Sequence, residues 1–390
     1  MTLAPGFQVD EAVTLLEICQ QTYNNTPSLG PPSKVCDLPP VPTPTGWQLV
    51  ADLTPTKATL LDNFWQVWQS ETDPNRYAIA VRGTVDTKPS IFADIFLPLI
   101  NARFDLKVGP VTVPFHLARD EGATAVRAGV HAGFALSLVL MLLTTDKSLI
   151  ATLAKLALAG NDVYITGHSQ GASIATLLTS LANHSTAAFK GASYKSYVYA
   201  PAKAGNDHYA YDYAQLVGVP GKGWTLASSQ GWVPQVPLTL EGTWDLNTPN
   251  PLFEYGGAAN PELPSAVKEL VENIDAGVKG AVDELIALLK KLIGDLAGKL
   301  SGEAIHLTAA DLGGEVDTAL DGSVVASVLD QILDQFQASL NYAQVGSVVP
   351  LFAVPGGNPS DGTPGCQKFD AFWQHHLGNY LKYLKAQYGG

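Results

Sequence analysis

Cysteine is scarce in this chain: Cys19, Cys36 and Cys366 are the only three among 390 residues. They form no C-x-x-C pair, which excludes the common zinc-type spacings. At most one disulfide and one free thiol could form, and the sequence does not reveal which cysteines would pair. We therefore expect no disulfide framework and no metal site, and no segment suggests a cofactor.

Basic residues are also few. The chain has 23 Lys and Arg against 36 Asp and Glu, for a formal net charge of −13. The basic residues form no continuous run, whereas binding to a phosphate backbone depends on a positive cluster. The acidic balance therefore argues against a nucleic-acid partner.

Long hydrophobic runs are missing as well. The longest, FALSLVLMLL at residues 134–143, is too short to span a bilayer, which needs about 20 residues. It predicts a buried helix and no transmembrane segment. The first residues, MTLAPGFQVD, lack both the basic start and the apolar stretch of a secretory signal peptide. We expect a mature secreted form that carries an added Met, with a cytoplasmic protein as the alternative.

What the chain does have is enough apolar sequence for a large core, with 46% hydrophobic and 15% charged residues. Outside residues 241–340, short β-branched or aromatic runs alternate with helical patterns. This alternation predicts an α/β fold with a mostly parallel sheet. We expect helices at 8–23, from about 133, and from the turn after 166 to about 182, and strands at 47–52, 64–68, 77–81, 163–166 and 196–199.

Residues 241–340 have a different pattern. Between 265 and 300, apolar residues recur at helical spacing with Lys, Glu and Asp between them, and a second helical pattern covers 324–340. We predict that residues 1–240 and 341–390 form one α/β domain and that 241–340 form a mostly helical insertion. The insertion would either pack as a static subdomain or move as a lid over a lipid-like substrate.

One segment, VYITGHSQGASIA at residues 163–175, joins an apolar run, a Gly-x-Ser-x-Gly turn and a row of small residues. A serine hydroxyl acts as a nucleophile only if a base takes its proton and the substrate can reach it. A sharp strand-to-helix turn exposes the hydroxyl, and glycines beside it let chain segments cross. The start of the following helix favours the negative charge of a reaction intermediate. Ser169 is therefore the candidate nucleophile, against the alternative of a purely structural turn.

Seven short segments outside residues 241–340 follow one another in a specific order. They are QQTY (20–23), AVRGT (80–84), VHAGF (130–134), TGHSQG (166–171), APAKAGN (200–206), WVPQVP (232–237) and NYAQVG (341–346). This ordered set resembles class 3 lipases, the fungal-type triacylglycerol lipases, over most of the chain outside 241–340. The resemblance implies an α/β-hydrolase fold with a mostly parallel central sheet, ester or lipid substrates, and a lipid–water interface as a place of action.

The resemblance also implies an oxyanion hole. Thr84, the third residue of Arg-Gly-Thr, matches the first donor, and the backbone N–H of Gln170, directly after the serine, matches the second. Two N–H donors about 3 Å from a tetrahedral oxyanion can contribute a few kcal/mol each. The alternative for Thr84 is an ordinary residue at the end of a strand.

The base that activates the serine should be a histidine. His168 adjoins the serine on the turn, and His131 matches a family position other than the base. His116, His184, His208 and His306 lie in helical or variable regions. The remaining pair stands in FWQHHLGNYLKYL, where the family pattern selects His375, with His376 as the alternative. No third ligand at a characteristic spacing makes this pair a metal site.

The resemblance also implies a carboxylate that orients this histidine, located just before a Val-Pro pair, and that carboxylate is missing here. In SSQGWVP, residues 228–234, the expected position is occupied by Gly231. Three explanations remain open. The acid could come from elsewhere in the chain, with Asp245 as the nearest downstream candidate; the site could be a Ser–His pair without an acid; or an Asp could have been replaced in this variant. We expect a serine ester hydrolase; its rivals are a catalytically silent binding protein of the same fold, an amidase and an acyltransferase.

Overall fold

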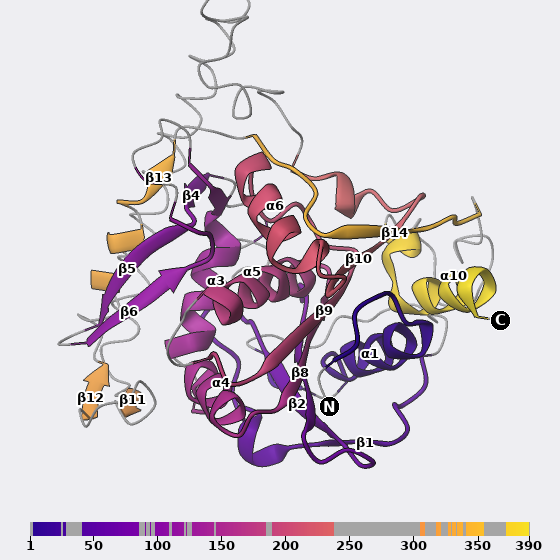
Figure 1. The fold of residues 1–390 in the computed structure, drawn as a ribbon, viewed down its shortest axis with the longest axis horizontal. Coiled ribbons are helices and arrows are strands. Elements are labelled where there is room, and N and C mark those ends of the chain that lie inside the picture. The colour runs from indigo at the N-terminus through magenta and orange to yellow at the C-terminus, as the bar shows by residue number, and fades with distance from the viewer. Residues whose placement is uncertain are drawn as a thin grey trace, which may run out of the picture.

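The molecule is built around a seven-stranded sheet with the order β1-β2-β3-β8-β9-β10-β14 (Figure 1). β1 (Trp47–Leu49), β2 (Trp65–Ser70) and β3 (Arg76–Val81) pair antiparallel. From β3 onward, β8 (Asp162–His168), β9 (Ser193–Tyr199), β10 (Gly223–Ser228) and β14 (Ser347–Leu351) pair parallel. The mostly parallel α/β sheet expected from the sequence is confirmed.

This description comes from a computed structural model. It covers residues 3–24, 26–28, 41–85, 90, 94, 98–108, 111–120, 122, 127–143, 146–184, 189–237, 305–308, 317–320, 327–328, 330–332, 334–337, 341–354 and 372–389.

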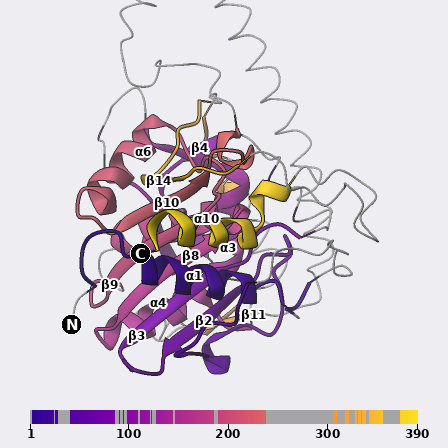
Figure 2. The same ribbon diagram turned by 90° about the vertical axis from the view of Figure 1, so that its right-hand side faces the viewer.

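Helices cover both faces of the sheet (Figures 1 and 2). On one face, α1 (Val9–Gln21) and α10 (Leu377–Tyr388) lie side by side. The other face carries α3 (Ala132–Leu143), α4 (Leu149–Leu158), α5 (Gln170–His184) and α6 (Asp207–Tyr213). Shorter helical turns are η1 (Ala51–Leu53), η2 (Ala214–Gly218), η3 (Val233–Gln235) and η6 (Trp373–His375).

The strands of the main sheet contribute to two separate cores. In β8, Val163 and Ile165 pack with α3 and α5, whereas Tyr164 between them packs with α1. A parallel sheet covered on both faces needs apolar side chains on both sides, which explains the uninterrupted apolar run before the serine. Every residue of α3 is buried, so the segment predicted as a buried helix is one.

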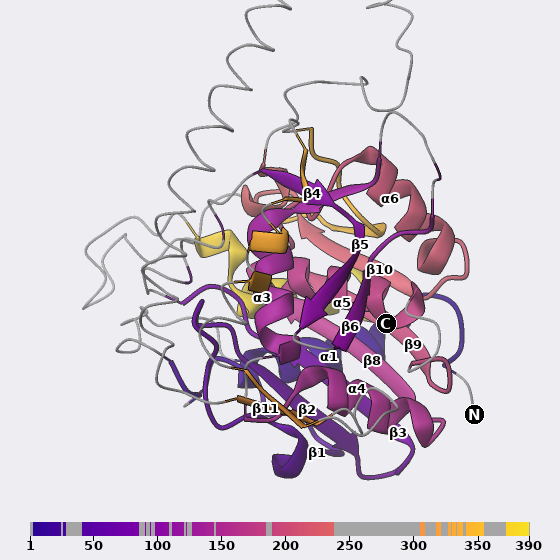
Figure 3. The same ribbon diagram turned by 90° about the vertical axis from the view of Figure 1, so that its left-hand side faces the viewer.

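Smaller sheets lie outside the main one (Figure 3). β4 (Leu99–Asn101) pairs with both β7 (Gly129–His131) and β13 (Phe336–Gln337), and β5 (Arg103–Val108) pairs with β6 (Val111–His116).

The helix predicted over 324–340 is wrong at its end, where the structure has β13. Residues 327–328 and 330–332 are helical, but Phe336–Gln337 is extended along the edge of β4. Among the described residues, no other strand pairs with this edge of β4. Within 241–340, β11 (Ile305–Thr308) also pairs with β12 (Asp317–Leu320). The helical pattern at 265–300 and Asp245 lie outside the described residues, and so the predicted insertion stays a prediction.

The described part of the chain contains no helix that is both long and apolar enough to cross a membrane. Of the three cysteines, Cys19 is a buried free thiol whose Sγ lies 3.2 Å from Thr166 Oγ1. Cys36 and Cys366 lie outside the described residues.

Candidate active site

Ser169 forms the turn between β8 and α5. Its φ of 59° lies in the left-handed region, which a residue with a side chain occupies only at a cost in energy. The turn is held because Ser169 N donates to Tyr199 O at 2.9 Å and Ala172 N donates to Ser169 O at 2.9 Å. The serine side chain is half-buried. A strained serine at an accessible strand-to-helix turn is typical of a nucleophile elbow.

Three glycines let chain segments meet at this turn. A Cβ at Gly167 would lie 2.3 Å from Gly171 O, and a Cβ at Gly171 would lie 2.2 Å from Val81 O. A Cβ at Gly83 would lie 2.4 Å from His168 O and 3.0 Å from Ser169 Cβ. The Arg-Gly-Thr segment therefore packs directly against the turn that carries the serine.

The side chains of Thr84 and Gln170 meet at one carboxylate. Thr84 Oγ1 donates to Asp94 Oδ2 at 2.7 Å, and Gln170 Nε2 donates to Asp94 Oδ1 at 3.0 Å. Burial raises the pKa of Asp94 to about 6, although these two hydrogen bonds oppose the rise. Sequence reasoning missed Asp94. The one available signal was a single Asp within the apolar stretch SIFADIFL.

His168 has both ring nitrogens engaged. Its Nε2 donates to the backbone oxygen of His375 at 2.8 Å, and its Nδ1 accepts from the Tyr23 hydroxyl at 2.8 Å. The Tyr23 oxygen in turn accepts from Gly83 N at 3.0 Å. Burial lowers the pKa of His168 to about 4, so its ring is neutral at pH 7. His168 thus connects the segment after α1, the Arg-Gly-Thr segment and η6 at the serine turn.

His375 lies against this histidine, with the two ring centroids 4.6 Å apart. The side chain is buried, and neither ring nitrogen has a hydrogen-bond partner among the described residues. Burial, together with the neighbouring His168 and His376, lowers the pKa of His375 well below its ordinary value. The ring is therefore neutral at pH 7, which is the form that accepts a proton. In this structure it makes no hydrogen bond to Ser169.

His376, the alternative base, is half-buried at the N-terminus of α10. Its ring packs edge-on to Trp373, with centroids 6.2 Å apart. Across the described part of the chain, no group of three His, Cys, Asp or Glu side chains could hold a metal ion.

Gly231 stands in a loop that is tied to α10. Its N–H donates to Ser228 O at 3.1 Å, and Ser228 N donates to the Tyr380 hydroxyl at 3.0 Å. A Cβ at Gly231 would make only ordinary contacts, 3.5 Å from Ser228 and 3.7 Å from the Tyr380 hydroxyl. The position therefore has room for a side chain. No carboxylate is hydrogen-bonded to His375 in the part of the protein described here.

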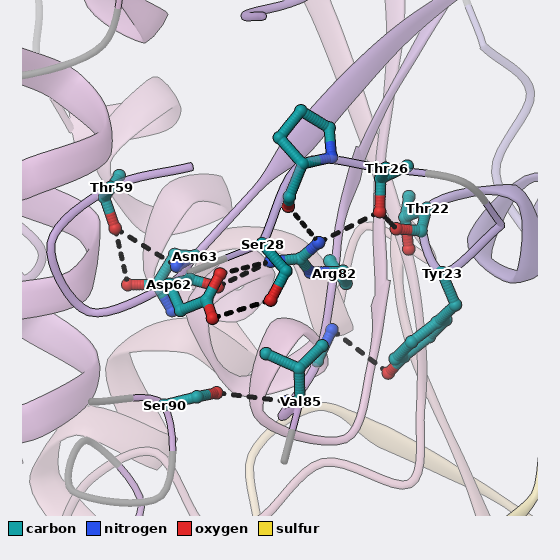
Figure 4. Close-up of polar contacts among 12 residues, drawn as sticks. Thr22, Tyr23, Thr26, Ser28, Thr59, Asp62, Asn63, Arg82, Val85 and Ser90 are labelled. Carbon is teal, nitrogen blue, oxygen red and sulfur yellow. Dashed lines mark hydrogen bonds and ion pairs between the residues drawn. The ribbon is translucent and has the colours of Figure 1, made fainter. Parts of the chain in front are cut away.

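Behind the Arg-Gly-Thr segment, Arg82 and Asp62 form a buried ion pair (Figure 4). Arg82 Nη2 lies 2.9 Å from Asp62 Oδ1 and donates to Asp62 O at 2.7 Å, and Nη1 donates to Pro27 O at 2.6 Å and Thr26 Oγ1 at 2.9 Å. The two side chains are 1% and 0% exposed. The pair thus fastens the loop before β2 to the end of β3, next to Gly83.

Comparison with known proteins gives one family match. Residues 78–241 match the family model described as lipase (class 3). No curated protein sequence matches this chain significantly.

Among solved structures, the chain is similar to three fungal lipases. They are the native Rhizomucor miehei lipase propeptide complex (17% identity, 59% of this chain and 63% of that chain, TM-score 0.37), the lipase from Rhizopus microsporus var. chinensis (20%, 60% and 71%, 0.38) and lipase II from Rhizopus niveus (20%, 59% and 75%, 0.38). The chain spans less than two thirds of the first of these.

The matched residues contain the serine turn, the Arg-Gly-Thr segment, Asp94 and Gly231, whereas His375 lies beyond them. The fold around them is that of an α/β-hydrolase, with a mostly parallel sheet flanked by helices. This protein therefore carries a class 3 lipase domain over residues 78–241.

Proposed function

We propose that the chain is a carboxylic ester hydrolase in which Ser169 is the nucleophile and His375 is the base. The observation that carries this proposal is the left-handed backbone of Ser169 at a strand-to-helix turn, packed against the Arg-Gly-Thr segment. Strained backbone conformations of this kind cluster at functional sites, where the surrounding structure holds them in place. The backbone oxygen of His375 accepts a hydrogen bond from the neighbouring His168, which places His375 beside that turn. The buried ring of His375 supplies a neutral imidazole there.

The reaction proceeds through an acyl-enzyme. Ser169 Oγ attacks the ester carbonyl carbon while His375 takes the hydroxyl proton. The backbone N–H groups of Thr84 and Gln170 stabilise the tetrahedral oxyanion. The C–O bond of the ester then breaks, and His375 protonates the departing alkoxide. A water molecule, deprotonated by His375, attacks the acyl-enzyme and releases the carboxylic acid, which restores Ser169.

The imidazolium that forms on His375 has no carboxylate partner among the described residues. In a Ser-His-Asp triad, loss of the orienting acid lowers the rate by about 10⁴-fold. The protein is therefore either a slow Ser–His hydrolase or a hydrolase that takes its acid from outside the described residues, where Asp245 is the candidate. The rival reading, a catalytically silent binding protein, rests on the same observation at Gly231.

The substrate is proposed to be an ester with an apolar acyl chain, such as a lipid. Phe372 lies 5.9 Å from His375 between ring centroids, and Trp232 lies 5.1 Å from Phe372. These two aromatic side chains are 44% and 45% exposed, so an apolar surface adjoins the base. A lipid–water interface and an extracellular location are further parts of this proposal.

Hydrolysis of p-nitrophenyl esters from short to long chains, in solution and as emulsions, tests the function. We expect measurable turnover that Ser169→Ala abolishes. Ser173→Ala should retain it, because Ser173 lies in α5 and its Oγ donates to Ala202 O. No turnover by the wild-type protein on any chain length would favour the silent binding protein. Equal loss in both serine variants would indicate a structural defect.

A further inference from the structure

Gln170 carries more than a backbone N–H at the serine turn. It is the first residue of α5, and its side chain is 1% exposed. Its Oε1 accepts from Asn63 Nδ2 at 2.9 Å, while its Nε2 donates to Ser90 O at 2.9 Å and to Asp94 Oδ1 at 3.0 Å. The amide therefore has a defined orientation, with its oxygen towards Asn63 and its nitrogen towards Asp94.

Asn63 is itself fixed by the loop that precedes β2. Its backbone N–H donates to Thr59 Oγ1 at 3.1 Å, and Thr59 Oγ1 lies 3.3 Å from Asn63 Oδ1, to which it donates. The same loop is held from its other side by the Arg82–Asp62 ion pair (Figure 4). Asn63 is 1% exposed, so water does not compete for its amide.

The hydrogen bonds form a chain in which every link has a required direction. Thr59 donates to Asn63, Asn63 donates to Gln170, and Gln170 donates to the carboxylate of Asp94. The same carboxylate accepts from the Thr84 hydroxyl. If Asn63 did not donate, the Gln170 amide could turn over and present its oxygen to the Asp94 carboxylate. The amide oxygen and the carboxylate would repel each other, because both are acceptors. The Asp94 side chain, to which Thr84 is hydrogen-bonded, would then be displaced.

We propose that Asn63 is a positioning residue for the oxyanion hole, acting through the Gln170 amide and the Asp94 carboxylate on Thr84. The inference rests on the proposed function, because it concerns the two residues whose N–H groups receive the oxyanion. It assigns a role to the loop before β2, which contains no residue of the proposed catalytic pair. Misplacement of a catalytic group by about 1 Å can cost about 100-fold in rate.

Asn63→Asp tests the direction of the chain, since it replaces the amide donor by an acceptor of the same shape. We expect kcat on a p-nitrophenyl ester to fall about 10- to 100-fold with KM within about threefold. A thionoester, whose developing negative charge lies on sulfur and gains less from an oxyanion hole, should lose less. The rate ratio of ester to thionoester should therefore fall about tenfold. A merely structural defect would leave this ratio unchanged.

The double variant Asn63→Asp with Asp94→Asn restores complementary directions at these two positions. The turned Gln170 amide would donate to Asp at 63 and accept from Asn at 94, which still accepts from Thr84, but it would lose its hydrogen bond to Ser90 O. We expect it to recover about tenfold of the kcat lost in Asn63→Asp. If Asn63→Asp does not fold, Asn63→Ala replaces it in the kinetic measurements, because it removes the donor without adding a charge. Asn161→Asp is the matched control, because Asn161 is also buried and donates from Nδ2 to Leu156 O, at the opposite end of β8.

The outcomes separate the two proposals. A wild-type protein that neither hydrolyses esters nor reacts with a fluorophosphonate overturns the proposed function and this inference with it. A reactive wild type whose folded Asn63→Asp and Asn63→Ala variants keep wild-type kcat overturns this inference alone. Equal losses on ester and thionoester, without recovery in the double variant, also overturn it, because they show a purely structural role.

Discussion

At the scale of single residues, burial moves the pKa values of the candidate base and of the carboxylate beside the proposed oxyanion hole in opposite directions. The cause is the same, because a buried site disfavours whichever protonation state is charged. The pKa of His375 falls well below its ordinary value, and that of Asp94 rises to about 6. At pH 7 the base is thus ready to accept a proton, and Asp94 is mostly ionised with two hydrogen bonds to hold it so.

The low pKa of His375 predicts the pH dependence of catalysis. The acidic limb of kcat/KM reports protonation of the base in the free enzyme. Because protonation requires a pH below its depressed pKa, activity should persist as the pH falls through 6.5 and decline only at lower pH. The profile of kcat/KM between pH 4 and 8 measures this. A limb centred at or above pH 6.5 would contradict the assignment of the buried His375 as the base.

The vacant position at Gly231 gives a second prediction. Gly231→Asp places a carboxylate where only ordinary contacts surround the new Cβ. If no other acid serves His375, kcat should rise by about 10²-fold or more, since an orienting acid is worth about 10⁴-fold in a complete triad. The carboxylate should also raise the pKa of His375 and move the acidic limb to higher pH.

Asp245→Asn is the counterpart of that experiment. If Asp245 already supplies the acid, this variant should lose activity severely, and Gly231→Asp should bring no gain. Indifference of both variants, combined with a high wild-type kcat, would show that the acid lies elsewhere.

At the scale of elements, α1 is docked on the sheet by one carboxylate. Glu11 Oε2 accepts from the buried Lys195 Nζ at 2.6 Å and from the Tyr197 hydroxyl at 2.6 Å, and its Oε1 accepts from the Tyr164 hydroxyl at 2.7 Å. Lys195 also donates to the backbone oxygens of Ala4 and Gly6. Because Tyr23 follows the end of α1 by two residues, this docking also supports His168.

Glu11→Ala should therefore lower the free energy of unfolding by roughly 3 kcal/mol, because it leaves a buried ammonium without its counter-charge. Denaturant unfolding at pH 7 measures the change. Asp10→Ala is the control, because Asp10 lies one residue earlier in the same helix turn and forms no ion pair with the described part of the sheet. A loss below about 1 kcal/mol would mean that the backbone acceptors satisfy Lys195 alone.

Elements with strong local patterns could be predicted from the sequence. The apolar run before Ser169 predicted β8, and its helical continuation predicted α5, because hydrophobic periodicity and the glycine turn are local signals. β13 could not be predicted, since a two-residue strand is defined by its partner β4, which is distant in sequence. Asp94 and Asn63 could not be predicted as site residues for the same reason. The roles proposed for them depend on Gln170, which only the folded chain brings into contact with them.

At the scale of the whole molecule, three buried histidines control stability in acid. Burial lowers the pKa of His131 to about 3, that of His168 to about 4, and that of His375 well below its ordinary value. An unfolded chain binds protons at all three below about pH 6.5, whereas the native state does not. The stability they contribute is complete above that pH and is lost as the pH falls. Asp94 acts in the opposite sense, because its native pKa is raised.

The three histidines lower the stability as the pH falls, and Asp94 opposes them. Together these four groups should make the free energy of unfolding fall by roughly 3 kcal/mol per pH unit between pH 6 and 5. Denaturant unfolding at several pH values measures the slope. His131→Asn should flatten it by roughly 1.4 kcal/mol per pH unit, since one titrating group is removed. Constant stability from pH 7 to 5 would show that these rings are protonated in the native state.

The most direct test of the central claim is active-site labelling with a fluorophosphonate at pH 7, followed by peptide mass spectrometry. A serine activated by His375 should react to one label per chain, located on the peptide that contains Ser169, and Ser169→Ala should remain unlabelled. His375→Ala should slow the reaction far more than His376→Ala. A wild-type protein that stays unlabelled, or a label located on another residue, would contradict the assignment of Ser169 as the nucleophile of an ester hydrolase.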